Sequence, residues 1–125
     1  MATASYLILG QVGSDSYYGN GTSAALTANT NTVLYQVPSS TQTVVSTITV
    51  CNQNSTAQTF RIAVKNAGTS VTARNYVAYD TPIAANDTIT LTLGVTLTNG
   101  GTGDSVVVYA SSANMSFHAY GSQLA

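Results

Sequence analysis

The sequence predicts an all-β protein, an antiparallel β-sandwich or jelly roll of about eight strands. Three observations predict it. Apolar and polar residues alternate with a period of two, clusters of Gly, Asn, Pro and Ser separate the alternating stretches, and Val, Ile and Thr fill them. No stretch has the period of an amphipathic helix. Short, evenly spaced strands in a chain of 125 residues are typical of these two architectures.

Alternation is clearest over residues 59–65 and 87–93. In both stretches the larger apolar residues share one face, and the intervening residues, Ala63 among them, share the other. The residues predicted to point inward are Phe60, Ile62 and Val64 in the first stretch and Ile89, Leu91 and Leu93 in the second.

Six further stretches have the same character and are predicted as strands: 6–12, 32–37, 43–53, 75–80, 105–110 and 114–120. Residues 51–60 are expected to form a hairpin, because Asn, Gln, Ser and Thr over 52–56 supply turn chemistry between two strands. Pro38 and Pro82 are placed at strand ends, where a missing N–H is tolerated.

Residues 10–31 are mostly polar, are rich in glycine and include aromatic residues, and their apolar and polar residues do not alternate. We expect a long exposed loop there, and such loops in compact domains are more often functional or bound to a partner than idle. The domain organisation that follows is an N-terminal strand or arm with an exposed loop over residues 1–31, and a β-sandwich over 32–125, within a single domain.

Charged residues are scarce. They make up 6 % of the chain, against about 25 % in ordinary soluble domains. Thr, Ser, Asn, Gln and Gly must therefore cover the surface, and the sheet edges have almost no Lys or Pro to protect them. We expect another chain, or the protein's own arms, to cover those edges. The seven charged residues are Arg61, Lys65, Arg74, Asp15, Asp80, Asp87 and Asp104.

This composition excludes several classes of function. Three cations cannot form the basic face that phosphate binding needs, so no nucleic-acid partner is expected. The apolar runs fall short of the ~20 residues of a spanning helix, so no membrane partner is expected either. No basic segment precedes an apolar stretch at the start, which argues against a secretory signal. Cys51, the single cysteine, is expected to be a small buried hydrophobe.

Candidate catalytic or metal-binding residues are few. His118 is the only histidine and has no Cys or His ligand set beside it, and the four Asp residues lie next to turn residues, which they are expected to cap. The Gly-rich stretch 100–103 has no following Lys, which favours a hairpin loop over a phosphate-binding loop. We therefore expect no enzyme, no catalytic residue, no metal and no cofactor.

The tyrosines are the remaining candidates for contact with a partner, because tyrosine brings a large contact area at low entropic cost. For Tyr35, Tyr76, Tyr79 and Tyr109, core and interface positions are equally open. The residues predicted to contact a partner lie near the N-terminus and in the expected loop: Ala2, Ser5, Tyr6, Tyr17 and Tyr18.

Several stretches together resemble a family of small β-sandwich virion proteins of tailed phages, especially phages of marine and freshwater cyanobacteria. The resemblance covers about residues 32 to 120. Its motifs are LYQVP at 34–38, TQTVVSTITVCN at 41–52, TFRIAV at 59–64, YVAYD at 76–80, NDTITLTLG at 86–94 and DSVVVYA at 104–110, followed by Ser116 and Phe117.

The resemblance implies a non-enzymatic structural protein of the virion, assembled in the cytoplasm of the host bacterium. A chain without a coiled coil, a collagen-like repeat or a second domain resembles a capsid decoration (cement) protein more than a fibre. Its expected partners are the major capsid protein and copies of itself, with a trimer as the expected oligomer. The alternative is a tail, collar, baseplate or fibre-associated protein that contacts a host glycan receptor, although the absence of Trp disfavours glycan recognition.

Overall fold

The computed structural model describes residues 5–20, 24–99 and 103–124. Over these residues the chain forms nine strands and one short 3-10 helix, and no helix there is long and apolar enough to cross a membrane. The predicted all-β class is confirmed. The elements are β1 (Ser5–Val12), β2 (Tyr17–Gly19), β3 (Thr32–Gln36), β4 (Gln42–Asn52), β5 (Gln58–Lys65), η1 (Ala73–Asn75), β6 (Tyr76–Ile83), β7 (Thr88–Thr98), β8 (Ser105–Ala110) and β9 (Met115–Leu124).

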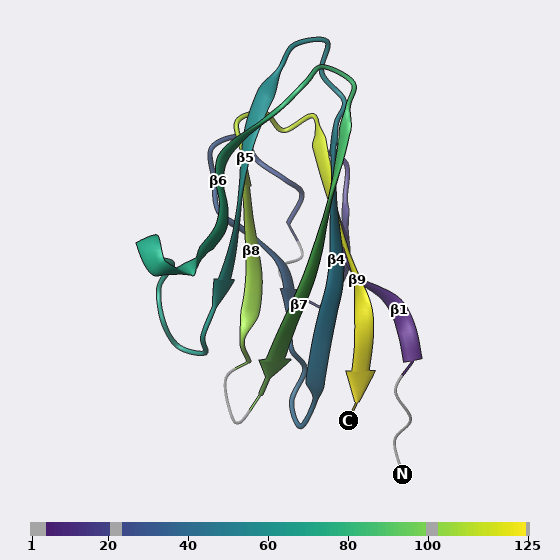
Figure 1. Cartoon of the computed structure of the whole chain (residues 1–125), viewed down its shortest axis with the longest axis vertical. Helices are drawn as coiled ribbons and strands as arrows, with labels where there is room; N and C mark the ends of the chain where they lie inside the picture. The colour runs from purple at the N-terminus through teal and green to yellow at the C-terminus, as the bar shows by residue number, and fades with distance from the viewer. Residues whose placement is uncertain (1–4, 21–23, 100–102, 125) are drawn as a thin grey trace.

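Two antiparallel sheets pack face to face (Figure 1). One sheet has the order β2-β1-β9-β4-β7 and the other has the order β3-β8-β5-β6. Without β2, these are the two four-stranded sheets of a jelly roll, in which most connections cross from one sheet to the other. The strand order, which alternation alone could not give, therefore selects the jelly roll from the two predicted architectures.

The core lies between the sheets and is formed by the inward residues of both. Phe60 of β5 and Phe117 of β9 are fully buried, with ring centroids 6.2 Å apart in an edge-to-face arrangement. Of the predicted inward residues, Ile62 is also fully buried, while Val64, Ile89, Leu91 and Leu93 are partly buried and pack against the core.

Ala63 lies on the outer face of its strand, as predicted, and outside the core cluster, but it is only 1 % exposed, because it sits between Val107 of β8 and Tyr76 of β6. The prediction for Cys51 is wrong. Cys51, expected to be buried, is half-buried, because alternation along β4 turns it away from the core, beside Ser116 and Thr88.

The predicted hairpin over 51–60 is also wrong. β4 pairs with β7 and β9, whereas β5 pairs with β6 and β8, so the connection between them crosses from one sheet to the other. The buried Asn52 holds this crossover. Its side-chain amide donates to the carbonyls of Thr56 at 3.0 Å and Ala84 at 3.1 Å, and its Oδ1 accepts from the backbone N–H of Asn54 at 2.9 Å. Turn residues mark a reversal of the chain, but they do not say to which sheet the chain returns.

The region expected as an exposed loop, residues 10–31, contains more structure than predicted. Its first residues complete β1, and Tyr17–Gly19 form β2, which pairs with β1 from Val12↔Tyr17 to Gly10↔Gly19. Gly19 has a φ of +106°, a conformation that glycine adopts readily and that ends the strand after three residues. Three residues are too few for period-two alternation to stand out in the sequence.

The Gly-rich stretch 100–103 lies largely outside the described residues, which exclude 100–102. The strands on either side of it, β7 and β8, belong to different sheets.

Candidate docking surfaces

The described candidate site residues lie on β1 and β2, at one side of the five-stranded sheet. Tyr6 is 73 % exposed and Tyr18 is 59 % exposed. The Tyr6 hydroxyl hydrogen-bonds the hydroxyl of Ser46 on β4, which holds the ring against the sheet surface. Ser5 begins β1, and Ala2 lies outside the described residues.

Strand alternation separates the two adjacent tyrosines of β2. Tyr18 pairs with Gln11 on the outer face, whereas Tyr17 pairs with Val12 on the core face and packs against the core. The Tyr17 hydroxyl is buried and has no hydrogen-bond partner among the described residues, and burial raises its pKa. Tyr18 and Tyr6 therefore expose aromatic rings that a partner could contact, whereas the Tyr17 ring packs between β2 and the core.

The outer face of the five-stranded sheet is a hydroxyl-covered surface. In cross-strand register, Thr90 and Thr49 lie beside His118, which pairs with Gln11 on β1, and Thr92 and Thr47 lie beside Tyr120. We call this surface the threonine face. Its described outward positions, from β7 to β2, are Thr88, Thr90, Thr92, Gly94, Thr96 and Thr98; Gln42, Val44, Ser46, Thr47, Thr49 and Cys51; Ser116, His118, Tyr120, Ser122 and Leu124; Tyr6, Ile8 and Gln11; and Tyr18.

His118 is part of the threonine face. Its Nδ1 is 2.9 Å from the Tyr120 hydroxyl and 3.4 Å from Nε2 of Gln11, and partial burial lowers its pKa. Over the described residues, no three His, Cys, Asp or Glu side chains gather closely enough to hold a metal ion. The geometry therefore gives His118 a place in a hydrogen-bonded surface network.

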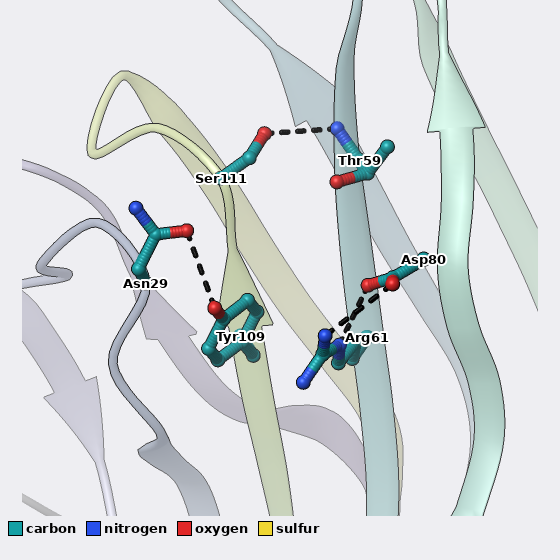
Figure 2. Close-up of polar contacts among 6 residues, drawn as sticks. All are labelled: Asn29, Thr59, Arg61, Asp80, Tyr109 and Ser111. Carbon is teal, nitrogen blue, oxygen red and sulfur yellow. Dashed lines mark hydrogen bonds and ion pairs between the residues drawn. The ribbon is translucent and has the colours of Figure 1, made fainter.

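The opposite outer face, on the four-stranded sheet, carries a second cluster that the sequence did not indicate. Arg61 of β5 lies between two aromatic rings, 4.2 Å from the Tyr79 centroid and 4.3 Å from the Tyr109 centroid. Its guanidinium donates to both carboxylate oxygens of Asp80, from Nε at 2.6 Å and from Nη2 at 3.3 Å (Figure 2). The Asp80 carboxylate raises the pKa of Arg61, so the guanidinium stays charged.

Further contacts extend this cluster, which we call the tyrosine–arginine cluster. The Tyr109 hydroxyl donates to Oδ1 of Asn29 at 3.2 Å, as Figure 2 shows, and the rings of Tyr76 and Tyr79 meet edge to face with centroids 4.8 Å apart. Tyr79 is 57 % exposed. Beside it lies an open hollow of about 570 Å³ lined by Val71, Thr72, Ala73, Tyr76 and Tyr79.

The prediction that the Asp residues cap turns is confirmed in part. Asp104 accepts from the backbone N–H groups of Ala67 and Thr98, and Asp87 accepts from that of Thr88. For Asp80 the prediction is wrong, because its carboxylate binds Arg61 and its φ is +46° within β6. Asp80 and Arg61 are 19 residues apart, and only the pairing of β5 with β6 brings them together.

No protein-family model matches the sequence, and no curated protein matches it. Among solved structures, a chain in the structure of infectious bursal disease virus, Gx strain, is similar in fold, with a TM-score of 0.50 and 12 % sequence identity. The match covers 98 % of this chain and 31 % of the viral one. At this identity the likeness shows a shared fold, and this chain corresponds to about a third of the viral chain.

Proposed function

We propose that this protein is a structural component of a virus particle, a decoration protein that binds the outside of the shell and cements neighbouring subunits. The observation that carries the proposal is the fold. Nearly the whole chain is a jelly roll that superposes on a chain of a virus structure. Jelly rolls also occur in lectins and cupins, so the fold leaves the role open and the surfaces must supply the rest.

The threonine face supports contact with other proteins over a broad area. It is built on five hydrogen-bonded strands and carries hydroxyls, and no outward residue of those strands is Asp, Glu, Lys or Arg. One charge borders it, because Asp15 lines a shallow hollow with Tyr18 and His118 at the edge of the face. Burying such a face avoids the desolvation cost of buried ions. The exposed rings of Tyr6 and Tyr18 at one side of this face supply the aromatic anchors that binding hot spots favour.

Cementing follows from several contacts made at once. A symmetric oligomer of the protein, or a single copy seated at a symmetric position, touches more than one shell subunit. Each further contact then forms at high effective concentration, so weak individual contacts become durable. The partners in this proposal are the major capsid protein and copies of this chain.

The test is to rebind the purified protein to particles stripped of it and to measure occupancy. Tyr6→Ala/Tyr18→Ala is expected to lower occupancy at least tenfold, because it removes both exposed anchors. The matched control is Tyr79→Ala, an exposed tyrosine on the opposite sheet, which is expected to leave occupancy unchanged. Equal occupancy for all three proteins would refute docking through the threonine face.

A second candidate function is favoured by the tyrosine–arginine cluster. An exposed aromatic ring beside a planar Arg–Asp pair and an open hollow offers stacking and directed hydrogen bonds to a sugar. In this function the protein sits on a tail, collar, baseplate or fibre and contacts a host glycan. The number of copies of this protein per particle separates the two functions. Hundreds of copies fit a decoration protein, and a few copies fit a tail protein. Glycan binding that Tyr79→Ala abolishes would favour this second function.

A further inference from the structure

The two sheets have four edge strands, and three of them carry features that hinder pairing with another chain. β2 has three residues and ends at Gly19. β6 contains Pro82 and the charged Asp80 in a left-handed conformation. β3 has five residues, and the N–H of Gln36 is already bonded to the carbonyl of Asn20 at 2.7 Å. Short strands, charges, prolines and covering loops are the usual means of protecting an edge.

The fourth edge strand, β7, is eleven residues long, Thr88–Thr98, and contains no charged residue and no proline. Among the described residues it pairs with β4 alone, and no described strand covers its other side. Its inward residues Ile89, Leu91, Leu93 and Val95 pack against the core but stay partly exposed along the open side of the sandwich. A long, uncharged, apolar edge is a template for strand addition.

Gly94 lies in the middle of β7, where the register with β4 shifts. Glycine inside a strand often marks such a bulge, and a bulge can turn an edge away from a partner. Here Leu93 and Val95 on either side of Gly94 still face the core, so the strand keeps its two faces through the irregularity. A methyl group built on Gly94 would meet nothing within 4 Å among the described residues, so the position is open to solvent.

The sequence of β7 indicates which chain approaches. TITLTLGVTLT has nearly the same pattern in both directions around Leu93. When two copies run antiparallel about that residue, Thr88 faces Thr98, Thr90 faces Thr96, Ile89 faces Leu97 and Leu91 faces Val95. Both the threonine face and the core face would then continue across the junction, with hydroxyls beside hydroxyls and apolar side chains beside apolar ones.

We propose that β7 is a self-association site, at which two copies of this chain pair antiparallel about a two-fold axis at Leu93. The five-stranded sheets of the two copies then join into one continuous sheet, and the half-exposed Leu91, Leu93 and Val95 become buried. A two-fold contact closes on itself, so it yields a dimer and not the trimer expected from the resemblance. The inference does not depend on a role in the virion.

The first test is a charge swap at a facing pair. In sedimentation equilibrium the unmodified protein is expected to have the mass of a dimer, which is twice the 12.8 kDa of one chain. Thr90→Lys/Thr96→Lys places like charges opposite each other and is expected to give a monomer. Thr90→Lys/Thr96→Asp places opposite charges there and is expected to remain a dimer. Both positions are exposed, so circular dichroism and the unfolding midpoint should show that each variant folds.

The second test fixes the register. In a Cys51→Ser background, a Thr88→Cys chain mixed with a Thr98→Cys chain is expected to form a mixed disulfide on oxidation, because facing residues have Cα atoms about 4.5 to 5.5 Å apart. Each variant alone should form none. The proposal is overturned if the unmodified chain is a monomer up to ~1 mM, which corresponds to a dissociation free energy of about 4 kcal/mol. It is also overturned if both charge variants behave alike, or if Thr88→Cys chains link to each other.

Discussion

Tyr35 and Thr43 form a buried polar pair among apolar core residues. Both side chains are at most 1 % exposed, and their hydroxyls are 2.7 Å apart. Tyr35→Phe leaves the Thr43 hydroxyl buried without a partner, so we expect the free energy of unfolding to fall by about 1–2 kcal/mol. Tyr35→Phe/Thr43→Val removes both polar groups and is expected to recover most of that loss. Denaturant unfolding of Tyr35→Phe, Thr43→Val and the double variant measures the coupling between the two hydroxyls. Losses in unfolding free energy that simply add in the double variant would contradict the prediction.

His118 gives the protein a pH dependence whose direction is fixed by burial. Its folded-state pKa lies below the ordinary value of 6.5, because burial disfavours the imidazolium. The resulting stabilisation is complete above the unfolded-state pKa of about 6.5 and is lost as pH falls through the lower folded-state pKa. An NMR titration of the imidazole should give a pKa below 6.5. His118→Gln should remove this part of the stability change as pH falls below about 6.5, and a pKa above 6.5 would contradict the prediction.

The candidate site illustrates which residues a sequence can reveal. Tyr6 and Tyr18 could be predicted as exposed, because composition alone marked their segments as unlike the core. Arg61 could not be placed between Tyr79 and Tyr109, because that geometry exists only once β5, β6 and β8 are neighbours. The sequence leaves Tyr35 open between core and interface, and its complete burial beside Thr43 places it in the core.

At the level of elements, Gly121 of β9 has the closest backbone neighbour of the described glycines. β9 runs between β1 and β4, and a methyl group on Gly121 would collide with the backbone carbonyl of Val44. Gly121→Ala is therefore expected to lower the free energy of unfolding by about 1–3 kcal/mol or to displace the strand pairing. Gly94→Ala is the matched control, since its added methyl meets open space, and it should change the unfolding free energy by no more than about 0.5 kcal/mol. Thermal or denaturant unfolding measures both changes. Equal losses of unfolding free energy in Gly121→Ala and Gly94→Ala would contradict the prediction.

Strand positions could be predicted well because alternation is a local property. Residues 105–110 were predicted with the bounds that β8 has, and 59–65 differ from β5 by one residue. The connections could not be predicted, because a turn between two strands has the same residues whether the chain returns to its own sheet or crosses to the other. The crossover at Asn52 is held by the carbonyl of Ala84, which is 32 residues away.

At the scale of the whole molecule, the scarcity of charge has a direct consequence for binding. The only ion pair among the described residues is Arg61–Asp80, and it lies on the sheet opposite the threonine face. Contacts made through the threonine face should therefore respond weakly to salt, because few fixed charges are available for screening. Occupancy on particles is expected to change less than twofold between ~50 and ~500 mM NaCl. Loss of the protein from particles over that range would show that ionic contacts hold it.

The jelly roll unites these features. It turns two faces outward, one covered with hydroxyls and one carrying the tyrosine–arginine cluster, and it leaves β7 as its open edge. The sequence could predict the two-sheet class from period and length, and it could predict a partner from composition. That a partner binds stays a prediction, and the face proposed to meet it depends on strand order, which is a property of the folded chain.

The most direct measurement of the central claim is the density of an intact particle at a resolution that traces this chain. The account predicts the jelly roll at repeated symmetric positions on the shell, with Tyr6 and Tyr18 buried against a neighbouring subunit. A particle that lacks the chain, or holds it with the threonine face turned to solvent, would contradict the account.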